Sequence, residues 1–197
     1  MDSIILKSKI CPPKLHSSYI KRPSLELKLM RAAEQVQAVS LIISPPGYGK
    51  TSLAASWIKT QEAVSWLTIG TADNVFNSFF RYLTESIKKN FPAFGKSINS
   101  AITSPIVKTP QYMAELFVYE LEHLEVQLSM VIDNYQEIVD QNIHRFMTVF
   151  LDDLPENLHL LILSQEDPPL SIASLRLKEN LIEIRQNDLS FGLEEIK

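Results

Sequence analysis

The chain has 197 residues, of which 45% are hydrophobic and 21% are charged, a composition that is typical of a globular domain with one core. Its 19 Lys and Arg residues are outnumbered by 23 Asp and Glu residues, and the net charge of -4 excludes a generally basic nucleic-acid binder, although not a local basic patch. The single cysteine, Cys11, excludes an internal disulfide.

The first 23 residues are predicted to form an extended leader, followed by one domain over 24–197. The prolines of the leader prevent a continuous helix there. Lys7 and Lys9 interrupt its apolar residues, so a signal peptide is not expected. The apolar runs of the chain are also far shorter than the ~18 residues that a membrane span needs. We therefore expect a cytoplasmic protein that has no membrane partner.

Helix starts are predicted from capping residues and apolar stripes. Ser24 is expected to cap a helix over 25–34, and Asn74 is expected to cap a helix whose apolar face begins at Phe76. A further helix is predicted to begin after Thr109, because proline follows it at the first helical position. Other amphipathic stretches are predicted as helices, from Lys50 onward, at 143–151 and at 172–178.

The remaining segments alternate with these helices. The stretch 91–108 contains one glycine and two prolines and is predicted to be an irregular connection. Short apolar runs are predicted as strands, at 38–43, 64–69, 128–132, 158–163 and 181–184. Five such strands alternating with helices indicate an α/β fold, with a parallel sheet covered by helices on both faces. Ligands of such sheets bind at the carboxyl ends of the strands.

The octapeptide SPPGYGKT, residues 44–51, follows the first predicted strand and opens a helix. It holds two of only 5 glycines in the chain, and it matches the phosphate-loop pattern G-x-x-x-x-G-K-[ST] except that serine replaces the first glycine. Gly47 and Gly49 allow backbone N–H groups to converge on an anion, and the helix N-terminus adds positive charge. Lys50 is suited to bind the β- and γ-phosphates, and the Thr51 hydroxyl is suited to ligate Mg²⁺.

Asp133 is a second candidate metal ligand, because it directly follows the strand predicted at 128–132. The carboxyl ends of parallel strands meet at one edge of a sheet, so this carboxylate is expected beside the phosphate loop, where it can hold Mg²⁺ directly or through water. Many buried strands end in an acid that only caps the next element. The phosphate loop about 80 residues earlier is what favours the metal role.

These segments resemble the nucleotide-binding (NB-ARC-like P-loop) domain of STAND-class signalling ATPases, in particular that of maltose-regulon activators and large ATP-binding LuxR-type transcription regulators. The matching stretches follow the family's order over nearly the whole chain, and only the GYGKT loop is specific on its own. They lie at 20–23, 44–51, 66–68, 73–74, 131–135, 164–176, 181–184 and 189–191.

The resemblance implies a P-loop NTPase three-layer sandwich with the strand order 5-1-4-3-2, and ATP or ADP with Mg²⁺ as cofactors. It also implies a regulatory switch, in which ADP holds a resting form and ATP with an inducer permits self-association and activation of transcription. Arg22 matches an arginine that the family places close to the nucleotide. The expected nucleotide contacts are Arg22, Pro46, Gly47, Tyr48, Gly49, Lys50, Thr51 and Ser52, and the expected metal ligands are Thr51 and Asp133.

Two departures from the family concern catalysis. Asn134 stands where an acid usually follows the magnesium aspartate, and an amide cannot take a proton from water. Gln165 stands where the family has a sensor arginine, so a fixed positive charge near the γ-phosphate is lost. Asp133, Asn134 and Gln165 are therefore the candidate catalytic positions of what is expected to be, at most, a weak ATPase.

A third departure concerns length. The sequence ends where the family's winged-helix region would begin, so we expect the winged helix, the sensor repeats and the DNA-binding helix-turn-helix to lie outside it, and we expect no direct DNA binding by this chain. Both an excised domain and a naturally short protein are consistent with this.

Three functions are open on the sequence alone. The phosphate loop, Asp133 and the resemblance favour an adenine-nucleotide-binding regulatory module of a signal-responsive transcriptional activator. A small-molecule phosphotransferase on the same scaffold would need an acceptor site and an arginine-bearing lid, and the sequence has no arginine cluster that suggests one. A degenerate, nucleotide-independent interaction scaffold would explain Asn134 and Gln165 as the remains of lost switching.

Overall fold

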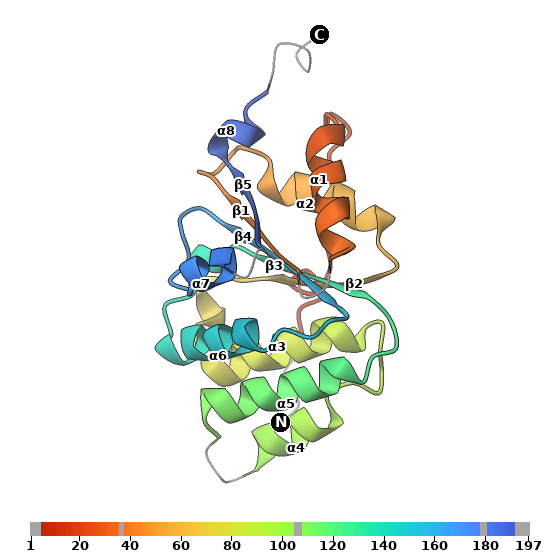
Figure 1. Cartoon of the computed structure of the whole chain (residues 1–197). Helices are drawn as coiled ribbons and strands as arrows, with labels where there is room; N and C mark the ends of the chain where they lie inside the picture. Colours follow the sequence, from red (N-terminus) through yellow and green to blue (C-terminus); the bar gives the residue numbers. More distant parts are fainter. Residues whose placement is uncertain (1–4, 36–37, 105–107, 178–180, 192–197) are drawn as a thin grey trace.

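The computed structural model describes residues 5–35, 38–104, 108–177 and 181–191, which form one parallel sheet between two layers of helices (Figure 1). The sheet has five strands in the order β2-β3-β4-β1-β5, and every neighbouring pair is parallel. The strands are β1 (Ala38–Ile43), β2 (Ala63–Thr68), β3 (Leu128–Asp133), β4 (Leu158–Ser164) and β5 (Leu181–Arg185). The predicted fold class and strand order are confirmed.

The three central strands are buried along their whole length, as expected of strands that are covered on both faces. All five strand predictions are within one residue of the observed bounds. β3 and β4 each extend one residue farther than predicted, to Asp133 and Ser164. Both polar side chains therefore lie at the carboxyl edge of the sheet.

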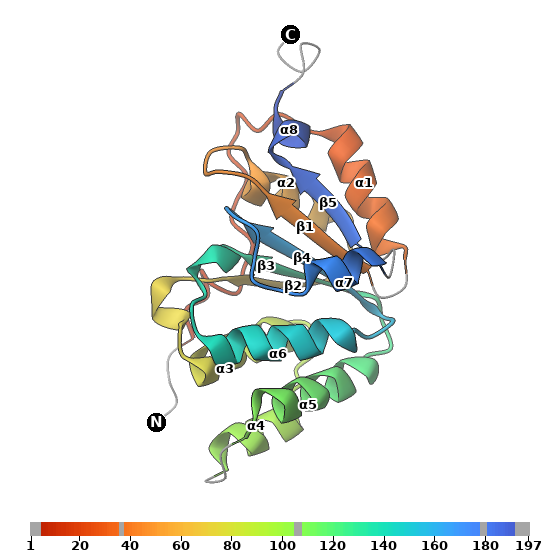
Figure 2. The same ribbon diagram turned by 60° about the vertical axis from the view of Figure 1, so that its left-hand side comes forward.

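The helices divide between the two faces of the sheet (Figure 2). One face is covered by α1 (Pro23–Ala33) and α2 (Lys50–Trp57). The other face is covered by α3 (Phe76–Lys88), α6 (Gln141–Asp152) and α7 (Ile172–Leu177), while α5 (Pro110–Glu122) packs on the far side of α3 and α6 and α4 (Lys96–Thr103) is outermost. A short helix, α8 (Gln186–Leu189), follows β5. Within the described residues, no helix has the length and hydrophobicity that a transmembrane span requires.

The larger core, between the sheet and α3, α5 and α6, is built on phenylalanines. Phe80, Phe117 and Phe146 come from one helix each and are fully buried. Their rings meet edge to face, with centroids 5.0 Å apart for Phe80 and Phe146, 5.5 Å for Phe80 and Phe117, and 5.8 Å for Phe117 and Phe146. Each such pair stabilises by about 0.5–1.5 kcal/mol beyond the burial of area. These contacts fix the packing of three helices that are distant in sequence.

The predicted helix caps have mixed outcomes. Thr109 is confirmed, because its side chain accepts a hydrogen bond from the backbone N–H of Tyr112 at 3.2 Å. Ser24 is wrong as a cap, since α1 begins one residue earlier, at Pro23, and Ser24 lies in the first turn. Proline with its fixed φ suits the first helical position, so it moves the start of this helix.

Asn74 is also wrong as a cap, because α3 is capped by a residue from another loop. The Asp140 carboxylate accepts hydrogen bonds from the backbone N–H of Phe76, at 3.2 Å, and from that of Asn142, at 2.8 Å. One side chain thus caps both α3 and α6. Asn74 instead bridges the two loops, since its amide donates to the carbonyl of Glu137 and accepts from the N–H of Val139.

The stretch 91–108, predicted to be irregular, contains α4. Gly95, with φ of +81°, stands at the start of this helix. Glu120 of α5 accepts hydrogen bonds from the backbone N–H groups of Gly95 and Ser97, both at 2.8 Å. The start of α4 is therefore stabilised by the carboxylate of Glu120, which lies 25 and 23 residues farther along the chain than Gly95 and Ser97. No local sequence pattern reveals such a partner. Residues 105–107, and the predicted helix end at 178, lie outside the described residues.

The leader is joined to the outer edge of β2 by Lys9. Its carbonyl accepts from the N–H of Thr68 at 2.8 Å, and its ammonium lies 2.5 and 2.6 Å from the carboxylate oxygens of Asp73. Asp73 is only 2% exposed, so this is a largely buried ion pair. From there Ile10 and Pro12 lie beside β2 and the end of α2, and Leu15 packs against the core beneath α1 and α2.

His159 is a fully buried histidine of β4, beneath α2. Its Nε2 lies 2.8 Å from the Ser40 hydroxyl, and the Trp57 ring packs against it at 5.1 Å. Burial lowers the pKa of His159 from 6.5 to about 4. The folded protein therefore resists a protonation that the unfolded chain accepts.

Acidification is expected to destabilise the protein through His159. The unfolded chain binds a proton near pH 6.5 and the folded protein only near pH 4, so stability is complete above about pH 7 and falls as the pH drops through this window. The loss by pH 4.5 is on the order of 2–3 kcal/mol in the free energy of urea unfolding. His159→Leu should flatten this dependence, whereas His123→Gln, at an exposed site, should not. An unchanged slope in His159→Leu would contradict the assignment.

Candidate functional site

The segment 44–51 leaves the carboxyl end of β1, between β4 and β5, and enters the first turn of α2, as predicted. Gly47 and Gly49 have φ of +89° and +80°. A Cβ at either glycine would meet no atom within 4 Å, so the left-handed backbone and not lack of space requires glycine here. Ser44 is not among the described residues that have positive φ, which explains why serine can replace the glycine of the pattern.

Lys50 bends back over this loop. Its ammonium donates hydrogen bonds to the carbonyl oxygens of Ser44, at 2.6 Å, and of Pro45, at 3.0 Å. Burial lowers the pKa of Lys50, and the charge of Asp133 partly opposes this effect. An ammonium has three donors, so Nζ is able to bond a phosphate oxygen held by the loop.

Thr51 and Asp133 lie side by side, although they are 82 residues apart. The Thr51 hydroxyl donates to both carboxylate oxygens, at 3.1 and 3.2 Å. Burial raises the pKa of Asp133, while the hydrogen bonds from Thr51 and from the N–H of Asn134 and the charge of Lys50 oppose the rise. A hydroxyl beside a carboxylate is a suitable donor set for Mg²⁺, which prefers oxygen ligands and is held by such a pair in phosphate-loop proteins.

Asn134 has a left-handed backbone, with φ of +62°, which asparagine tolerates better than most residues. Its N–H donates to the carboxylate of Asp133 at 2.9 Å. Asn134 therefore helps to orient the candidate metal ligand through its backbone. Its side chain is an amide, which cannot act as a general base.

Gln165 lies in the loop after β4 and is exposed. Its backbone N–H donates to the side-chain oxygen of Gln136 at 3.1 Å, so the loops that follow β3 and β4 are linked here. Gln136 was not singled out by sequence reasoning, and glutamine in a polar loop carries no distinctive signal. Neither Gln165 nor Asn134 is among the residues that line the cavity beside the phosphate loop.

A cavity of about 740 Å³ opens beside the phosphate loop, which is within the usual size range of small-molecule sites. Three segments line it: the leader, the loop with the first turn of α2, and the turn after α8. The lining residues are His16, Ser18, Tyr19, Ile20, Arg22, Pro46, Gly47, Tyr48, Gly49, Ser52, Leu53, Leu189, Ser190 and Phe191. The predicted contacts Arg22, Pro46–Gly49 and Ser52 thus face one cavity, while Lys50 and Thr51 lie at its phosphate-loop end.

Sequence reasoning missed two walls of this cavity, the leader at 16–20 and the turn at 189–191. Parts of both were present in the stretches that carry the resemblance, but no chemical motif marked them as lining. Arg22 is 6% exposed, and its guanidinium donates to the backbone carbonyls of Leu189, at 2.8 Å, Asp188, at 3.1 Å, and Ser190, at 3.3 Å. These are main-chain acceptors, which a sequence pattern does not display.

Comparison with known proteins identifies relatives among transcription regulators. No family model matches the sequence. The chain is 33% identical to the HTH-type transcriptional regulator MalT of Yersinia enterocolitica over 98% of its own length and 21% of that protein. It is also 33% identical to MalT of Vibrio parahaemolyticus, over 93% of its length and 20% of that protein. The chain is therefore homologous to one part of the MalT regulators. It spans about one fifth of their length, and the predicted resemblance to maltose-regulon activators is confirmed.

Solved structures share the fold of this chain. Cdc6p from Pyrobaculum aerophilum aligns with a TM-score of 0.55 and 13% identity, over 85% of this chain and 47% of that one. A Walker-type ATPase of Pyrococcus abyssi aligns with a TM-score of 0.52 and 13% identity, over 94% of this chain and 58% of that one. At such identities the likeness concerns the fold, which is that of the P-loop ATPases.

The raised pKa of Asp133 leads to a prediction for magnesium. Protonation of this carboxylate would compete with Mg²⁺ for the same oxygens. If Asp133 holds the ion beside bound ATP, any gain in ATP affinity from Mg²⁺ should decline at a higher pH than an ordinary aspartate would allow. The measurement is ATP affinity with Mg²⁺ and with EDTA from pH 7.5 to 5. Asp133→Asn is the control for titration of the phosphates themselves, and an identical decline in that variant would contradict the role of Asp133.

Proposed function

We propose that the chain is an adenine-nucleotide-binding regulatory module of a signal-responsive transcriptional activator. The observation that carries the proposal is the conjunction of the phosphate loop, the Thr51–Asp133 pair and the cavity of about 740 Å³ beside them. The MalT relatives are named as transcriptional regulators, which supports the regulatory part. The ligand is ATP or ADP with Mg²⁺.

The roles of the loop residues follow from their geometry. The backbone N–H groups of Gly47, Tyr48 and Gly49, with those at the start of α2, would surround the β-phosphate. Lys50 would exchange a carbonyl partner for a phosphate oxygen, and Ser52 would face the nucleotide from the first turn of α2. Thr51 and Asp133 would hold Mg²⁺, which neutralises phosphate charge when bound.

Slow hydrolysis is part of the proposal. An efficient ATPase needs a group that orients or deprotonates the attacking water and a cation that stabilises the γ-phosphate. Asn134 lacks basicity, and Gln165 lacks charge. A module with these residues is suited to a switch in which ADP and ATP favour different forms and in which the ATP form associates with other copies through the whole protein. Under this proposal the chain is an NB-ARC-like domain of the STAND class, and it acts in a cytoplasmic regulator of the LuxR type.

Lys50→Ala is expected to weaken ADP and ATP binding by about 10- to 100-fold, because charge-assisted hydrogen bonds to phosphate are lost. Calorimetric or labelled-nucleotide titration measures the change. Lys59→Ala, at an exposed lysine just beyond α2, is the matched control and should bind as the unaltered chain does. No binding by the unaltered chain at high micromolar nucleotide would overturn the proposal and favour a nucleotide-independent scaffold.

A further inference from the structure

Arg22 lies on the wall of the cavity, but its guanidinium donates hydrogen bonds to the backbone carbonyls of a short stretch of chain. We propose that Arg22 is a positioning residue, which fixes the segment 186–191 as one wall of the nucleotide cavity and does not ligate the phosphates. This segment, the turn, consists of α8 and the two residues after it. This inference rests on the proposed function, because it assigns how a residue of that site acts.

The guanidinium is matched to this task by its shape. Its Nη1 donates to the carbonyl of Leu189, and its Nη2 donates to those of Asp188 and Ser190, so one planar group spans three consecutive carbonyls. These carbonyls are at the C-terminal end of α8, where the backbone has unsatisfied acceptors and partial negative charge. The Phe191 ring also lies 4.7 Å from the guanidinium carbon. A lysine in this place could offer only a point charge.

The start of the same turn is tied to the phosphate loop. The Gln186 side-chain amide donates to the Tyr48 hydroxyl at 2.9 Å. Leu189, whose carbonyl Arg22 binds, has a side chain that is 2% exposed and belongs to the core beneath α1 and α2. The turn is therefore held at its first residue by the loop, and at 188–190 by Arg22 together with the packing of Leu189.

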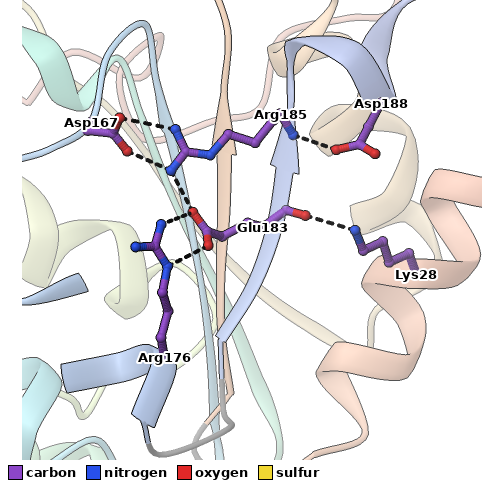
Figure 3. A network of polar contacts seen from close by, with 6 residues as sticks. All are labelled: Lys28, Asp167, Arg176, Glu183, Arg185 and Asp188. Atoms are coloured by element: carbon purple, nitrogen blue, oxygen red, sulfur yellow. Dashed lines mark hydrogen bonds and ion pairs between the residues drawn. The ribbon is translucent and has the colours of Figure 1, made fainter. Parts of the chain in front are cut away.

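The strand β5, which leads into the turn, is held by a network of ion pairs (Figure 3). Arg185, directly before α8, binds Asp167 at 2.7 and 3.0 Å and Glu183 at 2.6 Å. Glu183 also accepts two hydrogen bonds from Arg176, and the two arginines lower its pKa to about 2. The backbone N–H of Arg185 donates to Asp188 at 2.8 Å. With β5 fixed in this way, Arg22 decides how close the following turn lies to the leader.

A wall-holding arginine and a phosphate-binding arginine have different energetic signatures. Removing a ligand of the γ-phosphate weakens ATP more than ADP, since only the triphosphate has that group. Removing a residue that holds a wall weakens both by the same factor, because both nucleotides share the part that fills the cavity. The ratio of the two losses therefore distinguishes a wall-holding Arg22 from one that binds the γ-phosphate, and the exchange of the turn amides without nucleotide distinguishes it from a ligand of the shared phosphates.

The first experiment measures ADP and ATP dissociation constants, with Mg²⁺, for the full chain and for Arg22→Lys and Arg22→Gln. We expect both variants to weaken both nucleotides by at least fivefold, with the two losses equal within twofold. Arg31→Gln, at the exposed end of the same helix, is the matched control. Retention of ATP affinity in Arg22→Lys, or a loss for ATP several times that for ADP, would overturn the inference.

The second experiment needs no nucleotide. Hydrogen exchange of the backbone amides at 188–191 should accelerate at least tenfold in Arg22→Gln and remain unchanged in Lys50→Ala. Gln186→Leu, which cuts only the tie to Tyr48, should accelerate the same amides by a smaller factor and serves if the Arg22 variants fold poorly. Unchanged exchange in Arg22→Gln, or in Gln186→Leu where that variant must serve, would overturn the positioning role. Failure of the unaltered chain to bind nucleotide would instead overturn the proposed function, and exchange alone would then decide whether Arg22 holds the turn.

Discussion

The hydrogen bonds between the Thr51 hydroxyl and the Asp133 carboxylate join two segments that are not neighbours in the sheet. Asp133 ends β3, Thr51 follows β1, and β4 runs between them. The contact requires all three strands to end at the same level, which the parallel pairing of β3 with β4 and of β4 with β1 provides. A carboxylate and a hydroxyl that are distant in sequence are thereby held together before any ligand arrives, and the remaining groups of the site are arranged around them.

Features that leave a local pattern are mostly predictable from this sequence, whereas helix starts that are stabilised by distant side chains are not. The five strands and the loop at 44–51 are predictable because burial on both faces and left-handed glycines leave local patterns. The starts of α3 and α4 depend on Asp140 and Glu120, which belong to other elements. Much of the cavity escapes prediction for a further reason, since the partners of Arg22 are backbone carbonyls, which every residue has.

Two cations give the extended leader a structural role. Lys9 is paired with the buried carboxylate of Asp73, and Arg22 is held by the end of α8. Removing one partner of a buried charge pair is costly because the other charge stays buried without compensation. The leader is therefore fixed at both ends, at the outer edge of β2 and beside β5, and its middle residues at 16–20 become a wall of the cavity. An extended chain with few internal hydrogen bonds thus becomes part of a binding site.

The double cap at Asp140 makes two distant helix starts a single cooperative unit. One carboxylate completes the first turns of α3 and α6, and Asn74 adds a second link between the loops that precede them. A local opening that frees one helix start deprives the other of its cap, so the two should unravel and re-form together. These hydrogen bonds also link the loop after β2 to the loop after β3, which contains Asn134, so a shift of one loop is expected to displace the other.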